Sequence, residues 1–228
     1  MSKHSPQELQ RIYAQRFADQ KERREAVWAV LIKDYFQKEI SPESSLLELG
    51  CGHGEFLRMI RAREKYGMDL NPDATKLAPP GVTIFEQDCS HTWPLSENSL
   101  DVIFTSNFFE HLPDKQALSR TLDEVTRCLK PQGRLIALGP NIAKLHGRYW
   151  HFWDHHLALT DLAFGETLKN RGFVVECSLA AFLPYTMANG RTQLLEPKAL
   201  ALLTRLYLKT RLLWPVLGKQ FLLIARKP

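Results

Sequence analysis

The chain has 228 residues, of which 44% are hydrophobic and 24% charged, a balance typical of one water-soluble globular domain. The first residues lack an apolar core, and no run of about 18 uncharged apolar residues occurs, so neither a signal peptide nor a membrane-spanning helix is expected. Four cysteines without Cys-x-x-Cys spacing indicate reduced thiols in a cytoplasmic protein, with no metal or disulfide framework.

The formal net charge of +5 is concentrated near the carboxyl end. From Arg191 to Pro228 there are eight Lys or Arg residues and one acid, whereas the preceding residues carry a net charge of −2. The basicity therefore belongs to the tail, and the body of the chain gives no electrostatic sign of a nucleic-acid partner.

The residues from Pro6 to about Lys38 have apolar side chains at helical spacing and predict one or two amphipathic helices. Tyr13 and Phe17 would either cover a cofactor mouth or pack on the edge of the sheet. The polar residues 41–45 then form a loop that leads into the first strand.

The stretch 46–57 reads LLELGCGHGEFL, which predicts a buried parallel strand, a tight turn and the start of a helix. Gly50, Gly52 and Gly54 remove the Cβ atoms that would keep a ligand away from the backbone. The amides at the start of the helix would then face an anionic or polar ligand group.

A phosphate-binding P-loop would need a Lys-Ser or Lys-Thr after this turn, and the dinucleotide fingerprint would need glycine in place of Glu55. The pattern present is Glu48-x-Gly50-x-Gly52-x-Gly54. It resembles the first motif of the class I S-adenosylmethionine (SAM)-dependent methyltransferases, in particular the type 11-like small-molecule subgroup. A glycine-rich turn without a ligand is the alternative.

The next two strands are predicted at 65–70 and 82–86, and each ends in an acidic side chain. Asp69 lies 19 residues after Gly50, a spacing that brings it beside the glycine turn in a right-handed strand-helix-strand unit. The resemblance implies that Asp69 binds the ribose hydroxyls and that the next residue, Leu70, also belongs to the cofactor site. It further implies that Asp88 and Cys89 contact the adenine. Asp69 and Asp88 could also be ordinary turn residues.

A fourth buried strand, 100–106, ends in Asn107-Phe-Phe-Glu-His111. This segment resembles the family's fourth motif, which implies that Asn107 faces the methionine part of the cofactor. The Pro-Pro pair of enzymes that methylate base amino groups is absent, which favours an oxygen or another small nucleophile. A helix from Asp114 to Leu129 and a strand from Arg134 to Leu138 extend the resemblance over roughly residues 45–140.

The segment 141–158 is unusually dense in aromatic residues and histidines. It follows the carboxyl end of the fifth strand, where open α/β sheets bind ligands, so we expect a loop that shapes the acceptor pocket. Its imidazoles could act as a general base. A zinc site made of His151, His155 and His156, or an aromatic flap with solvated histidines, are the alternatives.

A helix capped by Thr160 and ended by Gly172, and strands at 173–178 and 220–226, complete the predicted fold. The resemblance implies a Rossmann-like seven-stranded, mostly parallel sheet in the order 3-2-1-4-5-7-6, with the last strand antiparallel and helices on both faces. Residues 1–228 then form one domain: a helical cover (1–40), the core (41–178), an inserted lid helix (179–219) and the final strand (220–228).

Within residues 191–214 a helix is expected to start at Pro197, with Leu200, Leu203, Leu206 and Leu213 on one broad apolar side. Lys198, Arg205 and Lys209 would form a basic stripe. Such a helix could close the acceptor pocket, or it could dock reversibly on the anionic inner face of the cell membrane.

The sequence as a whole predicts a methyltransferase that uses SAM and releases S-adenosylhomocysteine. The acceptor would be a small molecule, a sugar or a lipid-linked compound methylated on oxygen, with His111, His155 or His156 as the base. A non-catalytic SAM-binding protein and a nucleic-acid methyltransferase are the alternatives. The cofactor residues are predicted to be Glu48, Gly50, Cys51, Gly52, Gly54, Asp69, Leu70, Asp88, Cys89 and Asn107.

Overall fold

The computed structural model of the protein describes residues 21–185 and 195–228, and a seven-stranded sheet lies at its centre. The strand order is β3-β2-β1-β4-β5-β7-β6, as predicted. The strands are β1 (Ser45–Leu49), β2 (Glu64–Asp69), β3 (Val82–Glu86), β4 (Leu100–Ser106), β5 (Leu129–Pro140), β6 (Val174–Leu183) and β7 (Gln220–Arg226).

The sheet is parallel from β3 through β5, and β7 lies antiparallel between β5 and β6. Every residue of β1 is buried, as expected for a central strand of a parallel sheet covered on both faces. The parallel strands therefore all end at the same edge of the sheet, where ligands bind in open α/β folds.

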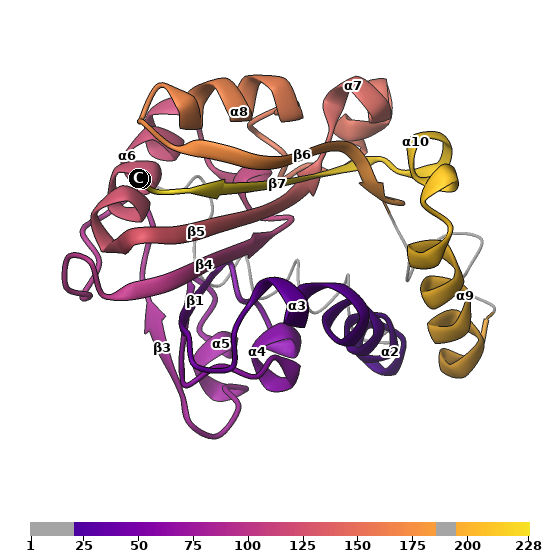
Figure 1. Ribbon diagram of the computed structural model, residues 1–228, viewed down its shortest axis with the longest axis horizontal. Coiled ribbons are helices and arrows are strands. Elements are labelled where there is room, and N and C mark those ends of the chain that lie inside the picture. Colours follow the sequence, from indigo (N-terminus) through magenta and orange to yellow (C-terminus); the bar gives the residue numbers. More distant parts are fainter. Residues whose placement is uncertain (1–20, 186–194) are drawn as a thin grey trace.

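Helices cover both faces of the sheet (Figure 1). One face carries α2 (Lys21–Leu31), a π-helical turn (Ile32–Phe36), α3 (Gln37–Glu39), α4 (Glu55–Met59), α5 (Asp73–Lys76) and α9 (Pro197–Lys209). The other face carries α6 (Lys115–Cys128) and α8 (Asp161–Lys169), and each face encloses its own apolar cluster. The remaining short elements are η2 (Phe109–His111), α7 (Ile142–Leu145), η3 (His146–His151), η5 (Arg211–Leu213) and α10 (Trp214–Leu217). Within 21–185 and 195–228, no helix has the length and apolarity needed to span a membrane.

The predicted helix starts are confirmed by capping hydrogen bonds. Asp114 accepts a 2.8 Å bond from the Ala117 amide at the start of α6, and Thr160 accepts a 3.0 Å bond from the Ala163 amide at the start of α8. Pro197 occupies the first turn of α9, where its missing amide proton leaves no bond unmade.

Two strands are longer than predicted. β5 begins at Leu129, which already pairs with Leu100 of β4. The pairing of the two strands shifts register between Leu100 and Val102, and Gln132, opposite this shift, has a positive φ of +67°. β6 runs to Leu183, which pairs with Gln220, so residues 179–183 belong to the sheet and not to the inserted segment.

The leucines predicted on one apolar side of α9 are divided between the interior and the surface, and Leu213 lies beyond this helix in η5. Leu200 is buried, but Leu203 and Leu206 are about half exposed, and the buried face consists of Leu200, Thr204, Tyr207 and Leu208. The helix lies against α2, and Arg205 forms a 2.9 Å ion pair with Asp34, so this member of the expected basic stripe is neutralised.

Candidate active site

The glycine turn after β1 is tightly packed. Gly50, Gly52 and Gly54 all have positive φ, at +70°, +50° and +71°, a region that side chains with a Cβ atom rarely adopt. A Cβ atom on Gly50 would lie 2.5 Å from the ring of Phe108, which follows β4. The turn therefore leaves no room for a side chain at Gly50, and Cys51 beside it is buried.

Asp69, at the end of β2, is joined to this turn through the backbone. Its Oδ2 accepts a 2.8 Å hydrogen bond from the amide of Gly52, and its Oδ1 accepts a 2.8 Å bond from the amide of Asn71. Burial raises the pKa of Asp69, and the backbone donors at Asn71, Gly52 and Leu70 partly offset that rise. These three donors leave part of the acceptor capacity of the carboxylate unused, and the ribose contact stays a prediction.

Glu48 lies in β1 beneath the turn and is buried. Burial, and then the nearby charges of Glu55 and Asp69, raise the pKa of Glu48 well above its usual range. Its Oε2 atom has no hydrogen-bond partner among the residues that the structure describes. A buried acceptor without a donor is costly, so this site favours a bound group that donates a hydrogen bond or carries a positive charge.

The residues after β3 form the next part of this edge. Asp88 is half buried and accepts a 2.9 Å hydrogen bond from the amide of Ser90; burial raises the pKa of Asp88, but the bonds from Ser90 outweigh it and lower the pKa overall. Cys89 is buried in the apolar cluster, with Sγ 3.4 Å from the hydroxyl of Thr121. The Cys89 side chain thus packs in the core, and its adenine contact stays a prediction.

The residue after β4 is held in an unusual conformation. Asn107 has φ of +50°, its amide donates a 2.9 Å hydrogen bond to the Leu138 carbonyl, and its side chain is exposed. Leu70, at the end of β2, is half buried. Asn107 and Leu70 thus lie at the ligand-binding edge, at the ends of their strands.

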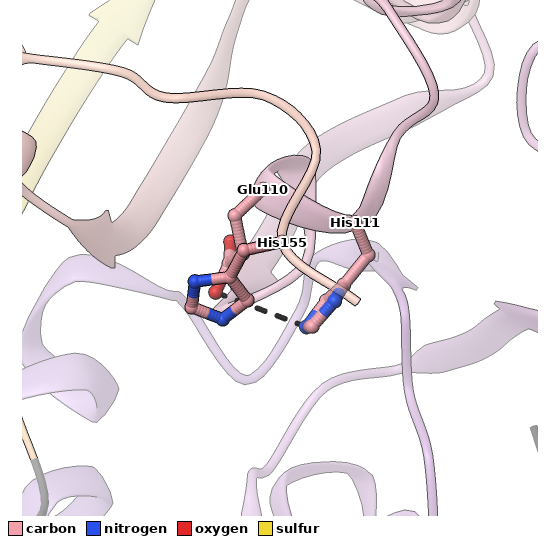
Figure 2. Close-up of side chains that lie close together, drawn as sticks. All are labelled: Glu110, His111 and His155. Carbon is pink, nitrogen blue, oxygen red and sulfur yellow. Dashed lines mark ion pairs between the residues drawn. The ribbon is translucent and has the colours of Figure 1, made fainter. Parts of the chain in front are cut away.

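Polar side chains form a second cluster just beyond β4, and Figure 2 shows three of them. Glu110 and His111 come from η2, and Asp154 and His155 come from the segment after η3. His111 Nδ1 lies 2.9 Å from the Asp154 carbonyl oxygen and 3.3 Å from its carboxylate Oδ2, while Nε2 lies 4.0 Å from Glu110 Oε1. The carboxylates of Glu110 and Asp154 are both buried.

His155 faces this cluster from a buried position, so it is not one of the solvated histidines that the alternative of an aromatic flap would contain. Its Nε2 lies 3.3 Å from the Tyr185 hydroxyl, and its ring packs on Tyr149 and Phe152 with centroids 4.7 Å and 5.1 Å away. The structure does not gather the three histidines of the alternative zinc site around one point. His151 is exposed, and His156 is half exposed, with its backbone amide donating a hydrogen bond to the Glu110 carbonyl.

Several residues of the site were missed in the sequence. Phe108 and Glu110 were quoted within the fourth motif without a role, and Asp154 and Tyr185 were not considered. The close spacing of Glu110 to His111, and of Asp154 to His155, was the available signal. The expected cover by Tyr13 and Phe17 lies outside the described residues.

The chain belongs to the family described as the methyltransferase domain, whose family model matches residues 20–178. The fold is similar to that of a SAM-dependent methyltransferase from Archaeoglobus fulgidus, with a TM-score of 0.67, 21% identity, and coverage of 95% of this chain and 98% of that chain. A SAM-dependent methyltransferase from Thermotoga maritima gives a TM-score of 0.65 at 19% identity, over 95% and 99% of the two chains.

Two curated relatives match part of the chain. A 2-methyl-6-phytyl-1,4-hydroquinone methyltransferase from Synechocystis is 28% identical over 50% of this chain and 38% of its own length. A glycine/sarcosine/dimethylglycine N-methyltransferase from Actinopolyspora halophila is 30% identical over 45% of this chain and 20% of its own length. The chain thus belongs to the methyltransferase-domain family, and it spans well under half the length of these two relatives.

Proposed function

We propose that this enzyme transfers the methyl group of SAM to an oxygen atom of a small-molecule, sugar or lipid-linked acceptor. The observation that supports this most directly is the cluster of Glu110, His111, Asp154 and His155 at the edge of the sheet where ligands bind. Groups that accept protons are more useful to a hydroxyl acceptor, which is a poor nucleophile until it loses its proton, than to a neutral amine.

The cofactor would be held by the glycine turn and the carboxylates around it. The lack of Cβ atoms at Gly50, Gly52 and Gly54 would allow a ligand to approach the backbone closely, and Glu48 offers an acceptor to a cationic or donor group of the ligand. SAM, when bound, supplies an electrophilic methyl group on a sulfonium. The residues of this chain then orient the two reactants and exclude water, which accounts for most of the rate enhancement in a displacement of this kind.

The acceptor oxygen would be activated at the histidine cluster. His111 lies three residues after Phe108, close to the end of β4, and Asp154 orients its ring through Nδ1. His155 and His156 come from the segment that borders the same cluster. Loss of such a proton-accepting group typically lowers the rate by about 10²–10⁴-fold.

Release of S-adenosylhomocysteine in the presence of pooled acceptors tests this function. Pools of phenols, sugars and lipid-linked sugars are compared with pools of amines, and products are analysed by mass spectrometry to locate the methyl group. We expect turnover with a hydroxyl acceptor and its loss in His111→Ala. Methylation of amines alone would contradict the oxygen assignment, and SAM binding without turnover on any pool would favour the non-catalytic alternative.

A lipid-linked acceptor is supported by the surface formed by α9, η5 and α10, which Figure 1 shows at one end of the molecule. Seven large apolar side chains there are between 41% and 88% exposed: Leu202, Leu203, Leu206, Leu212, Leu213, Val216 and Leu217. Residues 197–219 contain five Lys or Arg residues and no acid; Arg205 is paired with Asp34, and Arg211 lies over the ring of Trp214 at 5.5 Å. Two copies meeting through this patch would oppose like charges, whereas an anionic membrane would neutralise them.

Sedimentation with lipid vesicles tests this membrane contact. We expect more protein to sediment with vesicles that contain phosphatidylglycerol than with neutral phosphatidylcholine vesicles, and less of Leu212→Ser/Val216→Ser. Leu162→Ser is the matched control, because Leu162 is 78% exposed on α8 and should not change binding. Equal sedimentation with both vesicle types would contradict the proposal.

A further inference from the structure

Three side chains of the types that bind transition metals meet beyond the end of β4. We propose that Glu110, His111 and His155 form a binding site for one divalent transition-metal ion of the zinc type. This site deepens the function proposed above, because a cation held by the two imidazoles would replace them as the group that activates the acceptor oxygen, by binding that oxygen and lowering its pKa. Only that role rests on the proposed function; the site itself does not.

The geometry brings ligand atoms from two distant segments together. Glu110 and His111 are neighbours in η2, and His155 lies 44 residues later, yet the three ligand atoms lie within 4.8 Å of one another (Figure 2). Ligands of a tetrahedral ion at about 2.0–2.1 Å lie roughly 3.3 Å apart. Side-chain rotations that move the ligand atoms by about an ångström or more would bring them to this spacing, without movement of the sheet.

Both imidazoles are oriented by a second group, as is usual for histidines that bind metals. The Asp154 carbonyl and carboxylate face Nδ1 of His111, so the proton is held there and the lone pair of Nε2 points toward Glu110. The Tyr185 hydroxyl lies 3.3 Å from Nε2 of His155. The Asp154 carboxylate and carbonyl favour the His111 tautomer that can coordinate a cation, and a Tyr185 hydroxyl that accepts from Nε2 of His155 would leave Nδ1 of that ring as the ligand atom.

The surroundings favour strong electrostatic binding and still allow entry. Glu110 and His155 are buried, and the rings of Tyr149 and Phe152 pack around His155. Low polarity around the ligands strengthens their attraction to a cation. The side chain of His111 is 25% exposed, which provides a path from solvent.

The ligand set also indicates which cation binds. Two imidazoles and one carboxylate suit zinc, cobalt or iron, and the three protein ligands leave a coordination position for an acceptor oxygen. Magnesium and calcium prefer sets made of oxygen atoms and should bind poorly. The expected selectivity therefore distinguishes this site from a patch of acidic residues.

Titration of the chelator-treated protein with Co²⁺ tests the site without any activity measurement. We expect one Co²⁺ per chain, with visible absorption typical of coordination by nitrogen and oxygen, competition by Zn²⁺ and none by Mg²⁺. Glu110→Gln and His155→Ala should each weaken Co²⁺ binding at least tenfold. Asp154→Asn should weaken it about 10–100-fold, since its role is to orient a ligand.

The exposed His91 supplies the control, because His91→Ala should bind Co²⁺ like the unmodified protein. Circular dichroism and SAM affinity of each variant show that the fold is intact. Absence of Co²⁺ binding, or equal binding by Glu110→Gln and His155→Ala, would overturn the site. Co²⁺ binding at this cluster in a protein that transfers no methyl group would contradict the proposed function and support the site.

Discussion

The backbone amide of Gly52 donates a 2.8 Å hydrogen bond to Oδ2 of Asp69, which ties the glycine turn after β1 to the end of β2. The same carboxylate holds the start of the next turn through the Asn71 amide. One buried side chain thus shapes both loops that would border the cofactor.

Asp69→Ala and Asp69→Asn should weaken SAM binding by about tenfold or more. Hydrogen bonds to a charged group contribute roughly 1.5–3 kcal/mol; the alanine variant also frees the Gly52 and Asn71 amides from their acceptors, and the asparagine variant keeps only one of the two acceptor oxygens. Isothermal titration calorimetry on folded protein measures the effect. Asp123→Ala, an exposed acid on α6, is the control, and an unchanged SAM affinity in a folded Asp69 variant would refute the assignment.

Gly50→Ala should destabilise the protein by more than about 2 kcal/mol and abolish SAM binding. The new Cβ atom would meet the Phe108 ring at 2.5 Å, and positive φ adds strain of about 1–2 kcal/mol. Chemical denaturation gives the free energy of unfolding.

Gly172→Ala separates the cost of the positive φ from the cost of the clash with Phe108. Gly172 has φ of +85°, but a Cβ atom there would meet nothing within 4 Å, so only the backbone strain should be seen. The added substitution Phe108→Ala should restore part of the stability of Gly50→Ala. No recovery in this double variant would show that the clash with Phe108 is not the cause.

The sheet could be predicted from the sequence because the strands of a parallel sheet are short apolar runs, each bounded by a polar turn. The strand order and the SAM family came from resemblance, and the structure and the family match confirm both. The positions of Gly50 and Asp69 at one edge followed from their spacing of 19 residues.

The histidine cluster and the α9 surface could not be predicted in the same way. His155 is buried because Tyr149, Phe152 and Tyr185 surround it. Tyr185 lies two residues after the end of β6, and no local sequence pattern predicts its contact with His155. Apolar residues lie around most of α9, so its packing against α2 and β6 decides which of them are buried.

Glu48→Gln should weaken SAM binding but make the ligand-free protein more stable at neutral pH. The pKa of Glu48 is raised on folding, so the folded state binds more protons than the unfolded state above the ordinary carboxyl pKa. Stability of the unmodified protein therefore falls as pH rises from about 4.5 toward the raised pKa, and the glutamine variant lacks this loss.

Thermal unfolding from pH 5 to pH 8 measures this difference. We expect the two melting temperatures to diverge with rising pH by at least about 2–4 °C, the shift that 1 kcal/mol gives in a domain of this size. Glu86→Gln, at the exposed end of β3, is the control. Parallel pH profiles for Glu48→Gln and the unmodified protein would show that Glu48 carries no such cost.

Asp154→Asn should lower kcat by about tenfold or more and leave the affinity for SAM unchanged. The variant keeps the shape of the side chain and the carbonyl that faces His111, but it removes the negative charge 3.3 Å from Nδ1. Asp154 is therefore a positioning residue that acts through His111.

A double variant tests this dependence. Adding Asp154→Asn to His111→Ala should cause no further loss of kcat, because the effects of two residues that act together do not add. Kinetics with the acceptor found by the pooled screen give kcat and KM separately, and Asp154→Glu should restore part of kcat. Additive losses in the double variant would mean that Asp154 affects the fold or the acceptor independently of His111.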